Sequence, residues 1–404
     1  MRHVWTDEES AYVVAQLDKG VHYEDVAAAV TAAYGFKCSG GAIAGLGFRR
    51  GRRRRALVSP DRPPDAPAKS LDDMINEERL AALRRHEARE EKENVREQAR
   101  WKEFLETLKD AVVPLTFTQP KFAPPKVGKG DEEAAVLQVS DTHFGKLTQT
   151  YNIDVAQARF EKLVDKTLSI VALHRNAYPI KHLHIFFLGD IVEGEGIFPT
   201  QGAHLDAHAV KQALVPSQTV AGQLSRLACN FQTVTAHCVN GNHGRTSRFA
   251  AECANWDRVF YEVTKLATAN VPNIAWDLPS LDYDEWHKFA QVFNTRFLLI
   301  HGDQIRMTLN LPFYGVTTRV SRWASSKKVS GFDAVASAHF HVCYKLWWGQ
   351  KAVYANGTTV SDDDFALKGL GMESTERQWL YGVSPQHGVT WQYDLKVNLP
   401  GDER

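Results

Sequence analysis

The sequence has few cysteines and no long apolar stretch. Only five cysteines occur in 404 residues, and no two of them form a Cys-x-x-Cys pair. This spacing argues against a disulfide framework and against a zinc knuckle. No run approaches the ~20 apolar residues that a membrane-spanning helix needs, and the polar N-terminus lacks the apolar core of a signal peptide. We therefore expect a soluble cytoplasmic protein with no membrane partner.

The chain also lacks net charge, because 48 basic residues balance 48 acidic residues. The whole molecule is therefore not a polycation. Charge is nevertheless unevenly distributed, since six of the eight residues from position 48 to position 55 are arginine. The apolar fraction of 44% is ordinary for a globular protein, and the length suggests two or three domains.

Three regions differ in composition. Residues 1–58 are expected to form a small helix-turn-helix DNA-binding module, in which three short helices precede the arginine cluster. Residues 59–130 combine two proline-rich linkers with a long charged helix from Leu71 to about Leu108. Residues 131–404 alternate β-prone runs with helix-like stretches, which predicts an α/β domain.

The N-terminal region resembles small helix-turn-helix domains of the Myb-like and GcrA-like kind. The similarity rests on the opening Trp5-Thr6-x-Glu8-Glu9 and on the stretch from Ser39 to Leu46, where Ser39 is the expected N-cap of the third helix. This resemblance implies DNA binding.

Five short polar segments accompany β-prone runs in the C-terminal region. They are Ser140–His143, Gly189–Glu193, Gly241–Gly244, Ile300–Gly302 and Ala338–His341. The ends of strands in an α/β sheet form the crevice where ligands usually bind. Together the segments supply carboxylates, an amide oxygen and several imidazoles. Such a donor set suits two divalent cations that activate a water molecule and hold a phosphate.

The order Asp-x-His, Gly-Asp-x-x-Glu, Gly-Asn-His, His and His-x-His resembles the calcineurin-like metallophosphoesterase superfamily over about residues 136–342. The resemblance implies an α/β (α+β) metallophosphoesterase sandwich, in which two mixed sheets are flanked by helices. It assigns Asp141, His143, Asp190 and His341 to one metal ion, Asp190, Asn242, His301 and His339 to the other, and the catalytic role to His243. We expect Mn²⁺ as the metal, with Fe²⁺ or Zn²⁺ as alternatives.

Two positions depart from the family pattern. Gly244 stands where family members often have an acidic residue that orients the histidine, so Asp206, Glu252 or a backbone group is expected to replace that acid. Ala338 stands where glycine is common and leaves the ligands intact. Glu193 is expected in a solvated loop, with support of a metal ligand as the alternative.

The metal centre defines the reaction but not the ester that is cut. Arginines beside a helix-turn-helix favour a nucleic-acid backbone, and a solvated basic run or a localisation signal is the alternative. The nucleic-acid-binding set is Arg49, Arg50, Arg52, Arg53, Arg54, Arg55 and Arg245. The aromatic residues Phe313, Tyr314 and Trp323 are either base-stacking residues or parts of the core.

The catalytic region most resembles the nuclease branch of the superfamily, the Mre11/SbcD-like enzymes and phage DNA nucleases. This resemblance favours a metal-dependent DNA nuclease, in the host cytoplasm if a phage encodes it. About sixty residues follow His341, too few for a large capping domain or an ATPase-docking tail, so no ATPase partner is implied, and a homodimer is left open. The alternative is a phosphomonoesterase acting on phosphoprotein or a small nucleotide, with the N-terminal region as a protein-interaction adaptor.

Overall fold

The computed structural model describes residues 5–49, 71–112, 114, 128–198, 201–247, 250, 253–306, 312–362 and 376–400. The chain divides into two compact units, Met1–Ala82 and Leu83–Arg404, with the boundary inside a long helix. The domain boundaries expected at residues 58 and 130 stay predictions.

The N-terminal unit begins with the helices α1 (Asp7–Asp18), α2 (Tyr23–Tyr34) and α3 (Gly40–Arg49). A capping box starts α1, because the Thr6 hydroxyl accepts the N–H of Glu9 while the Glu9 carboxylate accepts the N–H of Thr6. Gly35, with a φ of 72°, ends α2 in the left-handed conformation that glycine adopts freely. The apolar faces of these helices form a small core that includes Val13, Val26, Val30, Ile43 and Leu46.

The long helix α4 (Leu71–Ala111) extends slightly beyond its expected end. Its C-terminal turns are amphipathic: Leu105 is fully buried, and Trp101 and Leu108 pack against the core of the C-terminal unit. Neither α4 nor any other helix in the described part of the chain is long and apolar enough to cross a membrane.

Two mixed sheets form the centre of the C-terminal unit. The larger has the strand order β11-β10-β1-β2-β3-β4, in which β1 to β4 run parallel and β10 and β11 are antiparallel to their neighbours. Its strands are β1 (Glu133–Val139), β2 (Ile180–Phe187), β3 (Thr233–Cys238), β4 (Ile274–Asp277), β10 (Arg377–Ser384) and β11 (Gly388–Lys396).

The smaller sheet has the order β5-β6-β7-β9-β8, with parallel pairing of β6 to β7 and of β7 to β9. Its strands are β5 (His287–Val292), β6 (Thr295–Ile300), β7 (Ala334–Ser337), β8 (Tyr344–Trp348) and β9 (Lys351–Ala355).

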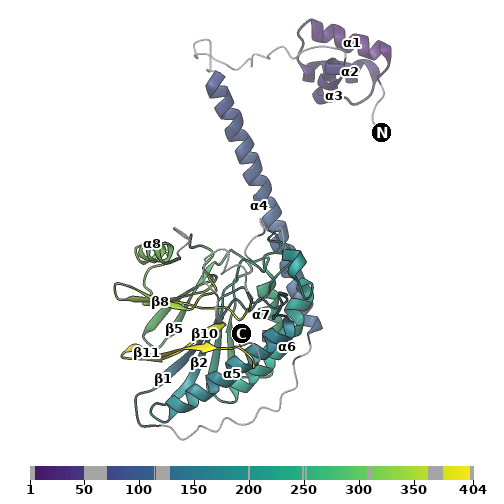
Figure 1. Cartoon of the computed structure of the whole chain (residues 1–404). Coiled ribbons are helices and arrows are strands. Elements are labelled where there is room, and N and C mark those ends of the chain that lie inside the picture. Colours follow the sequence, from purple (N-terminus) through teal and green to yellow (C-terminus); the bar gives the residue numbers. More distant parts are fainter. Residues whose placement is uncertain are drawn as a thin grey trace. The chain divides into compact units, whose positions relative to one another are not determined.

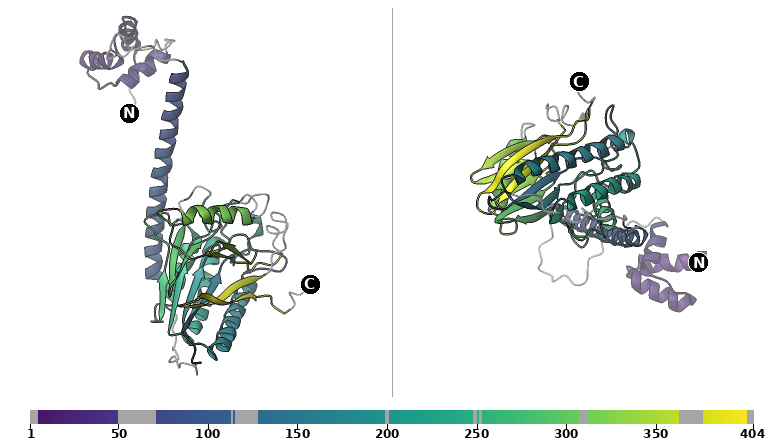
Figure 2. Two further views of the ribbon diagram at one scale, coloured as in Figure 1. Left: turned by 90° about the vertical axis from the view of Figure 1, so that its left-hand side faces the viewer. Right: turned by 90° about the horizontal axis from the view of Figure 1, so that it is seen from below.

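Helices cover the outer faces of the two packed sheets (Figures 1 and 2). On the larger sheet lie α5 (Ile153–Arg175), α6 (Ala209–Ala228) and α7 (Trp256–Ala267), whereas α8 (Pro312–Ala324) packs on the smaller sheet. A short 3₁₀ helix, η1 (Gln201–His204), precedes α6, whose N-cap is His208. The predicted sandwich of two mixed sheets flanked by helices is confirmed.

Alternation along β1 explains why both faces of the larger sheet are apolar. Leu137 points into the core under α5–α7, whereas Val136 points into the layer between the sheets. In β2 the same alternation separates Ile185 from Phe186. Successive strand residues face opposite sides, so strands covered on both faces read as continuous apolar runs. The polar residues directly after these runs are left at the edge of the sandwich.

Candidate metal centre

Polar side chains gather where five strands of the C-terminal unit end. Three of the strands, β1, β2 and β3, belong to the larger sheet, and two, β6 and β7, to the smaller sheet. The side chains meet in three overlapping groups, whose ligand atoms lie within 4.8 Å of one another: Asp141, His143 and His341; His143, Asp190 and His243; and Asp190, His301 and His339. The structure therefore brings together all of the predicted metal-binding segments.

Five of these residues hold a backbone conformation that side chains rarely adopt. Their φ angles are 48° at Asp141, 43° at His143, 51° at Asp190, 75° at His339 and 58° at His341. Left-handed residues other than glycine cost free energy and concentrate at functional sites. The tight turns after the strands direct the five side chains toward one another.

One cluster surrounds the Asp190 carboxylate. Nε2 of His301 lies 3.1 Å from Oδ2 of Asp190, 3.0 Å from Oδ1 of Asn242 and 3.2 Å from Nδ1 of His339. Asp190 and His301 are buried, and Oδ2 of Asp190 accepts no hydrogen bond within the described part of the chain. Oxygen and nitrogen atoms that commonly bind divalent cations thus face one another.

The surroundings of His301 fit a cation. Its Nδ1 donates to the carbonyl oxygen of Leu188 at 2.8 Å, so Nε2 carries no proton when the ring is neutral. The lone pair of Nε2 then points at the lone pairs of Asp190 Oδ2 and Asn242 Oδ1. Burial by itself lowers the pKa of His301, but the carboxylates of Asp190 and Asp141 raise it to about 10. The site therefore favours positive charge, and its mixture of imidazole and oxygen donors fits Mn²⁺, Fe²⁺ or Zn²⁺.

The second cluster joins Asp141, His143 and His341. Nε2 of His341 lies 3.4 Å from Oδ1 of Asp141 and 3.2 Å from Nε2 of His143. The hydroxyl of Ser140 donates to Oδ2 of Asp141 at 2.6 Å. Burial raises the pKa of Asp141, but the imidazoles of His341 and His301 hold it below its usual value. Asp141 is therefore an ionised ligand candidate at neutral pH.

Glu193 differs from the expectation of a solvated loop, because it is buried at the centre of the site. Its Oε2 lies 2.7 Å from Nδ1 of His143 and 3.3 Å from Nδ1 of His243. Burial raises the pKa of Glu193, but the two imidazoles lower it well below its usual value. One carboxylate thus orients a metal-ligand candidate and the catalytic candidate together, and His143 presents Nε2 to the cluster.

His243 lies at the rim of the site. Its backbone N–H donates to Oδ1 of Asp190 at 2.8 Å, and Phe198 packs on its ring with centroids 4.8 Å apart. Nε2 of Gln201 approaches its Nδ1 at 3.4 Å. Burial lowers the pKa of His243, but the carboxylates of Glu193 and Asp190 outweigh that effect and raise it.

Glu193 therefore occupies the place of the acid that the family pattern has at position 244, a role that was expected for Asp206, Glu252 or a backbone group. The carboxylate of Asp206 instead accepts the first N–H of α5 at 3.0 Å, and Glu252 lies outside the described residues. A Cβ at Gly244 would lie 2.2 Å from Oδ1 of Asn255, so an acidic side chain does not fit there.

Sequence reasoning missed Asp257, which is buried in the first turn of α7. Its carboxylate accepts four backbone N–H groups from the loops that carry Asp190 and Asn242. In the sequence, asparagine followed by an acid two positions later indicates only the start of a helix. Nothing in that local pattern reveals that the carboxylate points into the protein.

Of the predicted nucleic-acid-binding side chains, the described residues include Arg245. Its Nη2 lies 2.9 Å from Oδ2 of Asp303, which compensates its charge and joins the loops after β3 and β6. Arg49 ends α3, although its side chain is not described. The remaining members, Arg50, Arg52, Arg53, Arg54 and Arg55, lie outside the described residues.

The aromatic residues near α8 divide between core and surface. Trp323 is buried and packs against Trp286 with ring centroids 5.5 Å apart, so its core interpretation is correct. Phe313 packs edge-on against Tyr344 at 5.0 Å. Tyr314 is 56% exposed, and its base-stacking role stays a prediction.

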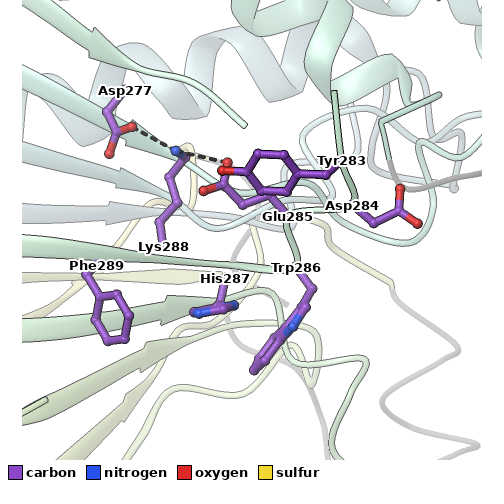
Figure 3. Close-up of a pocket in the computed structure, with 8 residues that line it drawn as sticks. All are labelled: Asp277, Tyr283, Asp284, Glu285, Trp286, His287, Lys288 and Phe289. Atoms are coloured by element: carbon purple, nitrogen blue, oxygen red, sulfur yellow. Dashed lines mark hydrogen bonds and ion pairs between the residues drawn. The ribbon is translucent and has the colours of Figure 1, made fainter. Parts of the chain in front are cut away.

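A separate cavity of about 410 Å³ is lined by Asp277 and by residues 283–289, none of which is a predicted metal ligand. In Figure 3 the Lys288 ammonium lies between the carboxylates of Asp277 and Glu285, at 2.8 and 3.1 Å. These ion pairs compensate the charge of the buried Lys288 side chain.

Comparison with known proteins places this geometry in a family context. Residues 134–366, more than half of the chain, match the family model described as calcineurin-like phosphoesterase. No curated protein sequence matches the chain.

Several solved structures are similar to this chain at low identity. One is Vps29 from Entamoeba histolytica complexed with Zn²⁺, at 12% identity and a TM-score of 0.29, covering 65% of this chain and 99% of that one. Another is a novel archaeal phosphodiesterase, at 11% identity and a TM-score of 0.33, with the same coverage of 65% and 99%. A conserved uncharacterised protein from Streptococcus pneumoniae, described as a predicted phosphoesterase, has 10% identity and a TM-score of 0.29, covering 66% and 99%.

The family match spans all five segments that supply the clustered side chains, from Asp141 to His341. The sandwich of two mixed sheets and the histidine and aspartate clusters at its edge agree with that match. This chain belongs to the calcineurin-like phosphoesterase family.

Proposed function

We propose that this protein is a dinuclear metal-dependent phosphodiesterase and that its substrate is DNA. The observation that carries the proposal is the buried Asp190 carboxylate, which belongs to two donor groups, one with His143 and His243 and one with His301 and His339. A carboxylate with two oxygens can serve two cations at once, which reduces their mutual repulsion.

The residues divide between two metal positions. Asp141, His143 and His341 would hold one ion, Asn242, His301 and His339 the other, and Asp190 would serve both. When bound, the two ions make a water molecule more acidic and offset the negative charge of the phosphate. The buried surroundings strengthen these electrostatic effects.

His243 is the proposed general acid. Glu193 engages Nδ1 of His243, so Nε2, on the other side of the ring, is the position from which a proton can pass to the leaving oxygen. The raised pKa of His243 keeps more of the ring protonated near neutral pH. A phosphodiester needs such an acid because its leaving alkoxide is strongly basic.

The N-terminal region favours DNA, rather than a small phosphate ester, as the substrate. Three short helices, α1 to α3, precede an arginine cluster in the sequence. Lysine and arginine side chains that neutralise phosphates give DNA affinity that falls with salt concentration. We propose that this region is a helix-turn-helix module that delivers DNA to the metal centre, and that the catalytic region acts as a nuclease of the Mre11/SbcD-like and phage kind that it resembles.

The proposal is tested by incubating the purified full-length protein and Mn²⁺ with end-labelled single-stranded, duplex and circular DNA. We expect cleavage that EDTA abolishes and that Asp190→Ala and His243→Ala each reduce at least about 10²-fold. Glu195→Gln, which changes an exposed carboxylate close in sequence to the site, is the matched control and should retain activity.

The competing phosphomonoesterase function predicts a different result in the same assay. Rapid turnover of an aryl phosphomonoester without any cleavage of DNA would contradict the nuclease proposal. Removal of residues 1–58 should abolish a salt-dependent DNA mobility shift while leaving turnover of bis(p-nitrophenyl) phosphate intact. Retention of full DNA affinity after this deletion would exclude the N-terminal region as the DNA-binding module.

A further inference from the structure

Two loops position the central part of the candidate site. The Asp190 loop (Gly189–Val192) follows β2, and the Asn242 loop (Gly241–Gly244) follows β3. They approach so closely that a Cβ on Gly189 would lie 2.4 Å from the nitrogen of Gly241, and a Cβ on Gly241 would lie 2.1 Å from Oδ1 of Asp190. The spacing of the two loops therefore determines the spacing of Asp190 and Asn242.

The carboxylate of Asp257 connects these loops. Its Oδ2 accepts the N–H of Asp190 at 2.9 Å and the N–H of Gly241 at 2.8 Å, so one oxygen atom joins the two loops. Its Oδ1 accepts the N–H groups of Ile191 at 2.9 Å and Val192 at 3.0 Å. Three of these four charge-assisted hydrogen bonds hold the Asp190 loop in its left-handed conformation, with a φ of 51° at Asp190, and the fourth holds the Asn242 loop.

Asp257 is not required to begin its own helix. Asn255 is the N-cap of α7, and its Oδ1 accepts the N–H of Asp257 at 2.9 Å. The Nδ2 of Asn255 also donates to the carbonyl oxygen of Gly241 at 2.8 Å, and the N–H of Trp256 donates to the carbonyl oxygen of Gly244 at 2.7 Å. The first turn of α7 is thus joined to the Asn242 loop by several bonds of its own.

The long helix α4 supports this turn from the outside. The ring of Trp256 packs edge-on against Trp101 and Phe104 of α4, with centroid distances of 5.2 and 6.2 Å. Leu105 on the same helix is fully buried in the core that includes α7. Packing of Trp256 against α4 restrains the turn from which Asp257 reaches the two loops.

We infer that Asp257 is a positioning residue, which holds the Asp190 and Asn242 loops at the separation required to bind metal. It accepts backbone N–H groups and has no assigned contact with the substrate. The inference rests on the proposed metal centre, and it identifies a residue outside the five motif segments on which that centre depends.

The test compares Mn²⁺ binding by the full-length wild-type protein and Asp257→Asn, measured by isothermal titration calorimetry. Asparagine has nearly the same shape, but its amide group cannot accept the N–H bonds that one carboxylate oxygen now accepts. We expect Mn²⁺ affinity to fall about 10- to 100-fold, the usual effect of losing a partner that orients metal ligands. We also expect the Mn²⁺ concentration for half-maximal activity to rise by a similar factor.

Asp154→Asn is the matched control. Asp154 also stands at the second position of a helix after an asparagine N-cap, since Asn152 caps α5, but its side chain is exposed. This variant loses the same charge at a helix N-terminus, and its Mn²⁺ affinity should equal that of the wild type. Circular dichroism of the metal-free proteins establishes that both variants are folded.

Each outcome has a distinct meaning. Wild-type affinity in folded Asp257→Asn overturns the positioning role, whereas failure of the wild-type protein to bind two Mn²⁺ ions overturns the proposed metal centre itself. If Asp257→Asn does not fold, Asn255→Ala is used, because it removes the bonds from Asn255 to the N–H of Asp257 and to the carbonyl oxygen of Gly241, and so loosens the turn that holds the Asp257 carboxylate against the two loops. A decrease in Mn²⁺ affinity in that variant supports the inference, and unchanged affinity contradicts it.

Discussion

Glu193 shows how one buried carboxylate can serve two imidazoles. It accepts from His143 at 2.7 Å and lies 3.3 Å from Nδ1 of His243, so it orients a metal-ligand candidate and raises the pKa of the proposed acid. A substitution that removes only the negative charge separates this electrostatic effect from packing, because glutamine has nearly the same volume.

Glu193→Gln is expected to lower kcat/KM about 10- to 100-fold, as loss of an orienting partner usually does. Activity that needs protonated His243 disappears as pH rises through its pKa, and removal of the carboxylate lowers that pKa. The alkaline limb of the pH profile should therefore move to lower pH. Measurement of kcat/KM against pH decides this, with Glu195→Gln as the control whose profile should match the wild type.

His184, on the strand β2, offers a test of stability that does not involve the metal centre. Burial and the neighbouring His237 and His182 lower its pKa to about 3. In the unfolded chain the ring titrates near 6.5, so below that pH the unfolded state binds a proton that the folded state rejects. The stability contributed by neutral His184 is complete above pH 6.5 and is lost progressively as pH falls from 6.5 toward 3.

His184→Leu should therefore make folding less sensitive to acid. Between pH 7 and pH 5 the wild type should lose up to about 2 kcal/mol more free energy of unfolding than the variant. Urea unfolding followed by tryptophan fluorescence at the two pH values provides the measurement. Equal losses in both proteins would show that His184 is not held neutral.

At the scale of elements, the C-terminal unit places its chemistry on short turns between rigid layers. The apolar faces of the strands are buried on both sides, which fixes the direction in which each strand ends. The turns that follow are strained at Asp141, His143, Asp190, His339 and His341. The packed sheets hold the turns in this strained conformation, because relaxing one turn would displace an entire strand end.

Gly244 illustrates how tightly these elements meet. A Cβ at this position would lie 2.2 Å from Oδ1 of Asn255 and 3.0 Å from the nitrogen of Asp257. Gly244→Ala should therefore push the first turn of α7 away from the Asn242 loop and destabilise the fold by about 1–3 kcal/mol. Thermal unfolding compares it with Gly202→Ala, which has open space around the added methyl group and should unfold like the wild type.

At the scale of the whole molecule, the metal centre should contribute to stability. Anything that binds the folded chain and not the unfolded chain stabilises it, by about 2.7 kcal/mol at a hundredfold excess over Kd. Mn²⁺ should then raise the Tm of the catalytic unit by about 4 °C. Asp190→Asn should abolish this increase, whereas Asp165→Asn, which alters an exposed carboxylate, should preserve it. If Mn²⁺ raised the Tm of Asp190→Asn by the same amount, the ions would have to bind at a site that does not include Asp190.

Much of the architecture could be predicted because the sequence expresses it locally. Buried strands such as β1 and β2 contain apolar runs, and the predicted metal-binding segments Ser140–His143 and Gly189–Glu193 begin within two residues of the ends of these strands. The metal-binding segments could be predicted because polar residues follow the apolar runs abruptly, which is also a local property of the sequence. The helix α4 was recognisable from its dense charge and its lack of glycine and proline.

Other features depend on residues that are distant in sequence and become neighbours only through packing. The sequence around Glu193 predicted a solvated loop. Its neighbours in sequence do not show that His143 and His243 contact its carboxylate in the folded chain. Asp257 was not predicted as a functional residue, and the sequence left Trp323 open between a base-stacking residue and a part of the core. In each case the side chain's partner belongs to another element.

The sequence by itself determined which residues can bind metal and which strand each of them follows, because apolar patterning and side-chain chemistry are properties of the chain. Only the tertiary structure decided which carboxylate orients His243 and which residue holds the Asp190 and Asn242 loops together. Those assignments depend on direction and distance between residues that are 50 and 67 positions apart in the chain, and local sequence does not encode such distances.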